Sequence, residues 1–168
     1  MNRGLASRWM TGARLQLVGV IRSPLTSRSR APKQGTEGAP DAWLEVRPWA
    51  ARGLRRVAPG DELIVITWFH QARRDVLQVR PRSDPRNPMT GVFATRSPDR
   101  PNPLGLHPVV VRAIEGTRLL VGPIEAIDGT PVVDIKPVLR SLAAESKVKN
   151  QPRMPAQRRG RRGGGCDR

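Results

Sequence analysis

Short apolar runs separated by proline and glycine are the feature that most constrains how this chain can fold. The strongest run lies within residues 62–70, directly after the turn signal Pro59-Gly60-Asp61, and is typical of a buried strand. No helical periodicity of any length precedes residues 138–142. Many short strands with Gly/Pro turns are typical of a barrel or a sandwich. We therefore predict an all-β fold: a small closed β-barrel of short, mainly antiparallel strands with one or two short helices.

The same patterns place the individual elements. Strands are expected at residues 15–21, 44–47, 62–70, 76–80, 91–95, 109–114, 119–121 and 132–136, with a short helix at 49–54. Glu115-Gly116-Thr117-Arg118 predicts a hairpin between two of these strands. We accordingly divide the chain into a flexible leader (1–14), the barrel domain (15–142) and a disordered Arg/Gly-rich basic tail (143–168).

Positive charge is concentrated at the two ends of the chain. The formal net charge is +16, of which residues 1–30 carry +6, residues 31–139 only +3 and residues 140–168 +7. Basic tails attract RNA or DNA in a salt-sensitive way, whereas they say little about what the folded middle recognises. The tail arginines are either a solvated polycation or a means of capturing nucleic-acid phosphates; they include Arg158, Arg159, Arg161 and Arg162.

Several classes of protein are disfavoured by composition. The lone Cys166 lies in the tail, so no disulfide can form within the chain, and two histidines without ligand spacing predict no metal site. The apolar run at residues 17–21 is too short for a signal peptide or a membrane span. No glycine-rich fingerprint of a Rossmann or P-loop site follows a strand. We expect a cytoplasmic protein that is not bound to a membrane.

A proline-rich segment at residues 95–106 is the best candidate for a binding loop. Each proline fixes its own φ and restricts the residue before it, and Asn102 is restricted from both sides by Pro101 and Pro103. A stiff loop that presents two guanidinium groups and an amide suits a polar, anionic or nucleotide-like ligand. The alternative is a rigid surface crossover whose arginines are merely solvated.

Four motifs taken together resemble a known family. They are Gly19-Val20-Ile21-Arg22-Ser23-Pro24, Phe69-His70-Gln71, the run from Thr90 through the proline loop, and Asp128-Gly129-Thr130-Pro131-Val132-Val133-Asp134-Ile135-Lys136-Pro137. In these motifs the chain resembles the TsaA-like, or TrmO-like, family of small β-barrel tRNA methyltransferases, over residues 17–139.

The resemblance implies a barrel that binds S-adenosylmethionine without a Rossmann fold, as a homodimer with the cofactor near the subunit interface. It also implies an enzyme that methylates N6 of N6-threonylcarbamoyladenosine beside the anticodon of tRNA. Longer relatives carry a C-terminal domain, and here a basic tail stands in its place, so the chain looks like a compact form.

Carried over by position, the implied cofactor contacts are Lys33, Gln34, His70, Gln71, Arg96, Asp128, Gly129, Thr130 and Pro131. Lys33 stands where relatives commonly have arginine; it keeps the charge but loses the bidentate fork. His107 stands where many relatives have serine, and Val138 replaces a frequent aromatic residue.

Methyl transfer from a sulfonium is an in-line displacement, so alignment supplies most of the catalysis. If a base is needed for the N6 proton, the candidates are Asp134 and His70. Asp134 and Lys136 are two apart on a strand and share a face, so the alternative to catalysis is an ion pair between them. Arg100 is a candidate for contact with tRNA phosphate or the partner subunit. Trp68 and Phe69 are expected in the core.

Two other functions are open at this point. The barrel could bind RNA or a nucleotide without chemistry, or it could use S-adenosylmethionine to methylate a different small substrate. All the readings that include the cofactor require the proline loop and the bend at Asp128 to meet at the rim of the barrel and to share one cavity.

Overall fold

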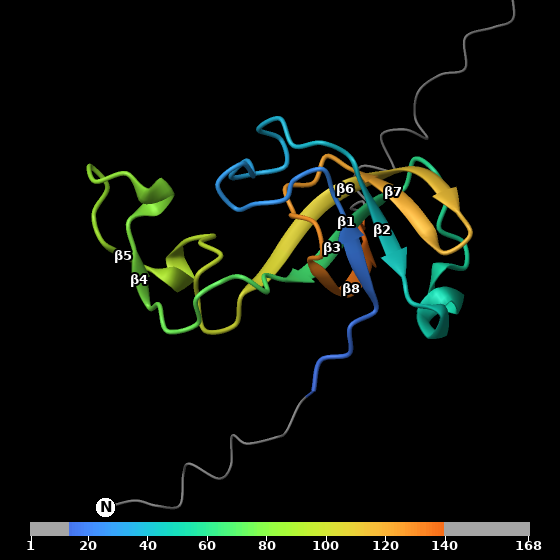
Figure 1. The fold of residues 1–168 in the computed structure, drawn as a ribbon, viewed down its shortest axis with the longest axis horizontal. Coiled ribbons are helices and arrows are strands. Elements are labelled where there is room, and N and C mark those ends of the chain that lie inside the picture. Colours follow the sequence, from blue (N-terminus) through green and yellow to red (C-terminus); the bar gives the residue numbers. More distant parts are fainter. Residues whose placement is uncertain (1–13, 140–168) are drawn as a thin grey trace, which may run out of the picture. The chain divides into compact units, whose positions relative to one another are not determined.

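A six-stranded antiparallel barrel forms the centre of the computed structural model, which describes residues 14–139 (Figure 1). Around the barrel the strand order is β1-β2-β7-β6-β3-β8, and pairing of β1 with β8 closes it. The bounds are β1 (Gly19–Arg22), β2 (Ala42–Val46), β3 (Glu62–Trp68), β6 (Leu104–Glu115), β7 (Arg118–Gly122) and β8 (Pro131–Pro137). The predicted all-β barrel is confirmed.

A second, two-stranded sheet pairs β4 (Gln78–Val79) with β5 (Thr90–Gly91), and Figure 1 shows this ribbon to one side of the barrel. Three short 3-10 helices complete the described elements: η2 (Pro48–Leu54), η3 (Pro81–Ser83) and η4 (Val92–Ala94). A proline at the start of η2 and of η3 supplies a φ already suited to a helical turn.

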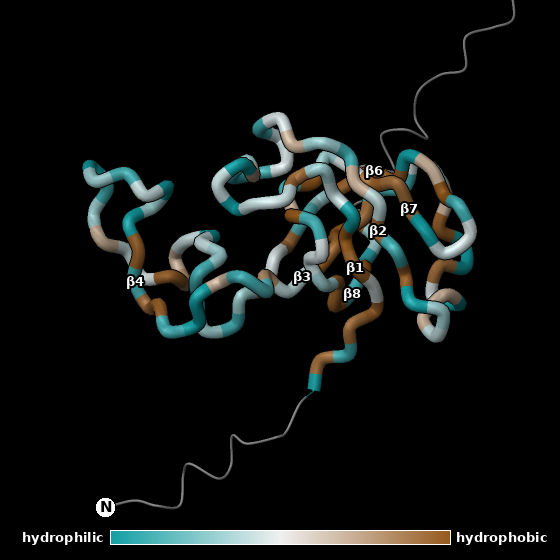
Figure 2. The backbone as a smooth tube through the Cα atoms, viewed as in Figure 1, coloured by the Kyte–Doolittle hydropathy of each residue, from teal (hydrophilic) through white to brown (hydrophobic). Residues whose placement is uncertain are grey.

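Alternating apolar residues fill the barrel. In β3, Leu63, Val65 and Thr67 are buried while their neighbours are more exposed, as the two-residue period of a strand requires. The described core comprises Ile21, Ala42, Leu44, Val46, Leu63, Val65, Val109, Val111, Leu119, Val121, Ile124, Ala126 and Val132. Figure 2 shows apolar stretches of the backbone along the barrel strands, with further ones around β4 and before β1.

Because of a register shift in the β3–β8 pair, two residues of β8 that are three positions apart both pack against the core. Ile66 pairs with Asp134, whereas the next residue, Thr67, pairs with Val132. This irregularity leaves one residue of β8 unpaired, as in a β-bulge. Val132 is consequently buried, and Ile135, three positions later, also packs against the core.

Most predicted strands have somewhat different bounds in the structure. The strands expected at residues 15–21 and 76–80, for example, are β1 at Gly19–Arg22 and β4 at Gln78–Val79. The prediction for residues 91–95 is wrong beyond Gly91, because the chain turns into η4, where the Thr95 amide donates to the Val92 carbonyl. The prediction of a strand beginning at residue 109 is also wrong, because β6 already begins at Leu104. There the end of the proline loop pairs with the end of β3, which the sequence alone does not reveal.

Candidate functional site

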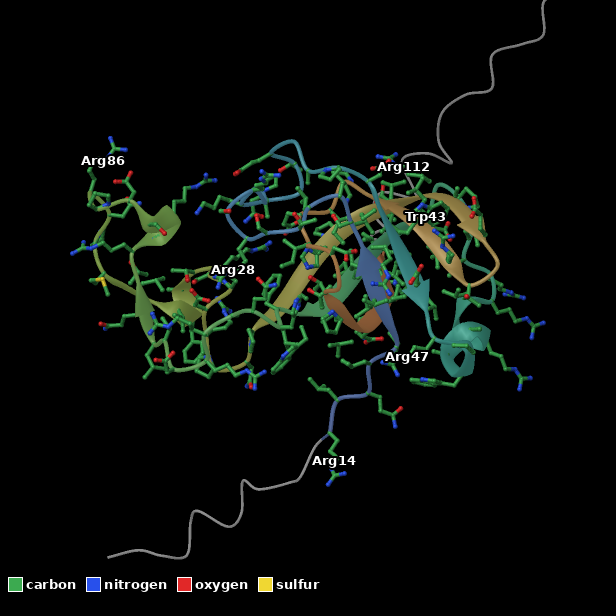
Figure 3. All side chains as sticks on the ribbon, in the orientation of Figure 1. Arg14, Arg28, Trp43, Arg47, Arg86 and Arg112 are labelled. Atoms are coloured by element: carbon green, nitrogen blue, oxygen red, sulfur yellow. The ribbon has the colours of Figure 1, made fainter. Side chains whose placement is uncertain are left out.

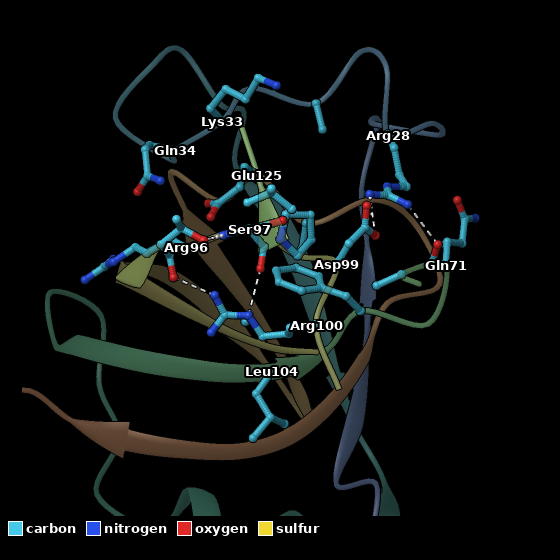
Figure 4. A pocket seen from close by; sticks show the side chains of 18 of the residues that line it. Arg28, Lys33, Gln34, Gln71, Arg96, Ser97, Asp99, Arg100, Leu104 and Glu125 are labelled. Carbon is cyan, nitrogen blue, oxygen red and sulfur yellow. Dashed lines mark hydrogen bonds and ion pairs between the residues drawn. The ribbon is translucent and has the colours of Figure 1, made fainter. Parts of the chain in front are cut away.

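A cavity of about 580 Å³ opens where β3 ends and β6 begins, and this size is in the range of small-molecule sites (Figure 4). Its lining comes from separate parts of the chain: residues 31–34, 69–72, 79–83, 94–100, 104–106 and 125–127, with Arg28 and Thr130. The proline loop and the residues on either side of the Asp128 turn therefore share one cavity, although Asp128 and Gly129 themselves do not line it.

Arg100 holds the proline loop in shape. Its Nε donates to the Ser97 carbonyl at 2.8 Å, and one of its terminal nitrogens donates to the carbonyls of Val92 (2.8 Å) and Thr95. One planar cation thus serves three backbone carbonyls of this segment. A contact of Arg100 with tRNA phosphate or a partner subunit, expected from the sequence, remains a prediction and would use the other terminal nitrogen.

An ion pair ties the proline loop to the long loop after β1. The Arg28 guanidinium lies 2.9 Å from Asp99 Oδ1 and also donates to the Gln71 carbonyl at 2.9 Å. The Arg73 amide donates to the same Asp99 oxygen at 2.9 Å. Sequence reasoning missed Arg28 and Asp99, since residues 71 apart carry no local signal of contact.

A buried polar chain runs from the barrel interior to the cavity. Thr67 Oγ1 lies 2.8 Å from His107 Nε2, and His107 Nδ1 lies 3.0 Å from Glu125 Oε1. The His107 side chain is 0% exposed and that of Glu125, which lines the cavity, is 18% exposed. The second contact is short, yet Nδ1 has no well-directed hydrogen bond among the described residues. We therefore treat it as an electrostatic contact between ring and carboxylate.

Gly105 leaves the space that the buried polar chain of Thr67, His107 and Glu125 needs. A Cβ at this position would lie 2.5 Å from Phe69 Cζ, 2.5 Å from Thr67 Oγ1 and 2.6 Å from His107 Nε2. Phe69 in turn meets the His107 ring edge-on, with the centroids 5.7 Å apart. Only glycine lets the three side chains approach the strand this closely.

The Glu125 carboxyl group is kept ionised by its neighbours. Burial opposes its ionisation, but the close contact with His107, a backbone hydrogen bond to the carboxylate and the charge of Arg96 together outweigh burial, and the pKa of Glu125 is lowered. Sequence reasoning missed Glu125 and gave His107 no role, because an isolated Glu and an isolated His have no motif that joins them.

Lys33 and Arg96 are cavity cations whose side chains have no direct polar partner among the described residues, although the charge of Arg96 also acts on Glu125. Neither side chain makes a hydrogen bond or ion pair with another residue in the range 14–139. By contrast, Arg82 is paired with Glu37, and Arg80 donates to the carbonyl of Asn87 at 2.8 Å. Lys33 and Arg96 are thus the groups in the lining best able to receive an anionic ligand group.

The other sequence candidates divide between the cavity and its supports. Gln34, His70, Gln71 and Thr130 line the cavity. Asp128, Gly129 and Pro131 do not: the Asp128 carboxylate instead accepts the Ser23 amide at 3.1 Å and so fixes the turn.

Asp134 also lies outside the lining, and the ion pair expected from its spacing to Lys136 is confirmed, at 2.8 Å. The contact lowers the pKa of Asp134, with the hydrogen bond from Lys136 as the main cause. Arg158, Arg159, Arg161 and Arg162 lie outside the described residues.

Both strand-end aromatic residues depart from the expected core placement. Phe69 is half-buried and lines the cavity, and Trp68 is half-buried beneath the Arg74 guanidinium, 4.8 Å from its ring centroid. Leu104 and Leu106 add exposed apolar surface to the lining. The cavity therefore suits a ligand that combines charged groups of both signs with an apolar or aromatic body.

Within residues 14–139 no cluster of three His, Cys, Asp or Glu side chains is arranged to hold a metal ion. No helix in this part of the chain has the length and apolar character needed to cross a membrane.

Residues 20–144 match the model of the tRNA-methyltransferase O N-terminal domain. The chain belongs to this family. It is 43% identical over 135 residues to a probable S-adenosyl-L-methionine-binding protein of Archaeoglobus fulgidus, covering 80% of this chain and 36% of that protein. It is 40% identical over 126 residues to the probable S-adenosyl-L-methionine-binding protein VirR of Rhizobium radiobacter, covering 74% of this chain and 70% of the relative.

Solved structures of the tRNA-methyltransferase O family share the fold. A crystal structure of TrmO from Pseudomonas aeruginosa matches with a TM-score of 0.57 and 30% identity, over 76% of this chain and 56% of the other. A further TrmO crystal structure matches with a TM-score of 0.59 and 32% identity, over 76% of this chain and 57% of the other. The chain thus spans little more than half the length of these structures and about a third of the Archaeoglobus relative.

Proposed function

We propose that this protein binds S-adenosylmethionine in the cavity and transfers its methyl group to N6 of N6-threonylcarbamoyladenosine beside the anticodon of tRNA. The observation that carries the proposal is the composition of the lining. Unpaired Lys33 and Arg96 face the same cavity as the ionised Glu125 and the apolar Phe69. Membership in the tRNA-methyltransferase O family supports both the cofactor and the class of substrate.

The lining offers partners for several groups of the cofactor. S-adenosylmethionine supplies an electrophilic methyl group on a sulfonium, and it also carries a carboxylate, an amino group, ribose hydroxyls and adenine. Lys33 and Arg96 would receive the carboxylate, and Glu125 offers a negative charge to the cationic part. Gln34, His70, Gln71 and Thr130 supply further polar groups to the lining. Asp128, Gly129 and Pro131 would act indirectly, by forming the turn that presents Thr130.

Rigidity is the main catalytic contribution that this chain offers. The proline loop is fixed by the Arg100 guanidinium and by the Arg28–Asp99 ion pair, so the cavity wall is set before a ligand arrives. Holding donor and acceptor in line needs such a wall, because alignment provides most of the rate enhancement in a displacement. His70 lines the cavity and Asp134 does not, so His70 is our candidate for accepting the N6 proton.

We further propose a homodimer, tRNA as the RNA partner and a cytoplasmic location. Support for the dimer comes from exposed apolar side chains at the cavity: Leu104 is 40% and Leu106 is 54% exposed. A second subunit that covered them would also exclude water from the site. The arginines of the basic tail are proposed to add salt-sensitive attraction to tRNA.

Two measurements test the proposed function. Titration calorimetry should show saturable binding of S-adenosylmethionine, whereas a barrel that binds only RNA would give no saturable heat. Mass spectrometry of tRNA nucleosides should show loss of methylated threonylcarbamoyladenosine in a deletion strain. If the cofactor binds but these nucleosides are unchanged, the substrate is a different molecule and the tRNA assignment is wrong.

A further inference from the structure

A row of basic and aromatic side chains lies on η2, outside the cavity. A 3-10 helix has three residues per turn, so Trp49, Arg52 and Arg55 at its end fall on one face. All three are exposed, and Trp49 is 58% exposed. The opposite side of the segment is fixed, because Ala50 and Leu54 pack against the barrel core. The row is therefore presented to solvent by an anchored element.

Two more arginines flank this row. Arg47 precedes η2 and Arg56 follows it, and both are exposed. We call Arg47, Trp49, Arg52, Arg55 and Arg56 the η2 basic surface. No acidic residue lies between residues 47 and 60.

The four guanidinium groups of the η2 basic surface are unpaired. None of them makes an ion pair or a side-chain hydrogen bond within residues 14–139, although other exposed arginines of the barrel do. Arg22 and Arg118, for example, both contact Glu45. An unneutralised cluster of this kind raises the local concentration of anions.

Arg56 also occupies an unusual backbone conformation. Its φ is 76°, in the left-handed region that normally favours glycine or asparagine. A long charged side chain at such a position costs stability relative to glycine, and strain of this kind is concentrated at functional positions. Arg56 thus places a charge at a position where the backbone alone would favour another residue.

The η2 basic surface and the cavity lie at opposite ends of the barrel. η2 leads toward the start of β3, whereas the cavity residues Phe69 and His70 follow the end of β3. Seven residues of strand separate the two, or roughly 20 Å. Figure 3 shows Arg47 beside the η2 coil, whereas Arg28 lies on the cavity side. A small substrate in the cavity cannot reach the arginines, but an RNA helix can span this distance.

We propose that the η2 basic surface binds the phosphate backbone of the substrate RNA, away from the nucleotide that enters the cavity, and that Trp49 stacks on a base or ribose there. Arginines suit phosphates because the planar fork matches two oxygens at once, and an exposed aromatic ring provides a stacking platform. The proposal rests on the proposed function, because it takes a structured RNA as the substrate.

The test compares two full-length double variants that lose the same charge. Arg52→Gln/Arg55→Gln alters the η2 basic surface. Arg86→Gln/Arg112→Gln is the matched control, because both of its arginines are exposed and are paired with Asp84 and Asp41. Binding of full-length tRNA is measured over a salt series, with S-adenosylmethionine binding and thermal unfolding measured in parallel.

We expect the η2 variant to bind tRNA about tenfold more weakly at moderate salt, and the slope of log K against log salt to fall by about 1–2, since each lost phosphate contact removes about 0.7–0.9. Cofactor affinity and unfolding temperature should be unchanged, and the control should retain the wild-type slope. Trp49→Ala should weaken tRNA binding without changing the slope.

Other results would overturn the proposal in distinguishable ways. If wild type and η2 variant bind tRNA with the same slope, the surface has no part in RNA binding, while the proposed function stands. If the wild type binds no tRNA at any salt concentration, the proposed function fails as well. If the variant loses binding to phosphatidylserine vesicles and keeps tRNA binding, the surface recognises a membrane instead.

Discussion

His107 Nδ1 lies 3.0 Å from Glu125 Oε1, so a fully buried imidazole supports the carboxylate that lines the cavity. The ring is held from the other side by Thr67, at 2.8 Å. Residues from β3, β6 and the segment after β7 are thus joined in one polar chain inside an otherwise apolar barrel. Buried polar groups are costly when they lose a partner. Changes at the Glu125 carboxylate in the cavity should therefore affect the stability of the barrel through His107 and Thr67.

Replacing His107 with alanine should therefore destabilise the protein by about 2–4 kcal/mol, through the cavity left behind and the unsatisfied Thr67 hydroxyl. Urea unfolding measures the change in the free energy of unfolding. His70→Ala, at an exposed imidazole, is the control and should change it by less than about 0.5 kcal/mol. Equal effects of the two substitutions would show that the buried chain does not stabilise the barrel.

The lowered pKa of Glu125 predicts that the stability of the folded protein depends on pH in the acidic range. A carboxyl group whose pKa is lower in the folded state stabilises the fold at pH values above its ordinary pKa of 4.5. This stabilisation is lost as the pH falls through the folded-state pKa. Unfolding midpoints measured from neutral pH to about pH 3 should therefore fall less steeply in Glu125→Gln than in the wild type. Parallel curves for the two proteins would contradict the shift and its cause.

Local sequence patterns predicted the barrel well because each strand carries its own alternation. The predicted strand at residues 132–136 agrees with β8, and the predicted helix at 49–54 agrees with η2. The start of β6 at Leu104 was not predictable, since it depends on pairing with the distant end of β3. Likewise, residues 91–95 have a strand-like composition, but the Arg100 guanidinium takes the carbonyls that a strand would share.

The site was predictable only where a motif marks it. Gln34, His70, Gln71 and Thr130 line the cavity as the resemblance implied, whereas Asp128 supports the turn. Arg28–Asp99 and His107–Glu125 were not predicted, because each contact joins segments far apart in sequence and depends on the closure of the barrel. Such contacts cannot be predicted from the local spacing of residues in the sequence.

Gly105→Ala should destabilise the barrel and disturb the polar chain. The added methyl would lie 2.5 Å from both Phe69 and Thr67, so these side chains or the strand must move, at about 1–3 kcal/mol. Gly53→Ala is the matched control, because nothing lies within 4 Å of its new Cβ. Thermal unfolding of both variants measures the difference, and a Gly105→Ala protein as stable as the control would contradict the packing described for His107.

Arg96→Ala should weaken S-adenosylmethionine binding by about 10–100-fold, the range expected for loss of one charge-assisted hydrogen bond in a partly enclosed site. The unfolding temperature should not change, because Arg96 makes no hydrogen bond or ion pair with the described residues. Calorimetric titration measures the affinity, with Arg112→Ala on β6, outside the cavity, as the control. Unchanged affinity in Arg96→Ala would move the proposed carboxylate contact to another cation such as Lys33.

Arg100→Lys should loosen the proline loop even though the charge is kept. Lysine has a single ammonium group and cannot reproduce the fork that serves the carbonyls of Val92, Thr95 and Ser97. Amide hydrogen exchange in the loop should rise, and S-adenosylmethionine affinity should fall with it, because the cavity wall is then ordered only on binding. Arg73→Lys is the control, since its side chain pairs only with exposed Asp75 and its contact with Asp99 comes from the backbone amide. Wild-type exchange and affinity in Arg100→Lys would show that the prolines alone keep the loop rigid, and that the guanidinium is free to act elsewhere.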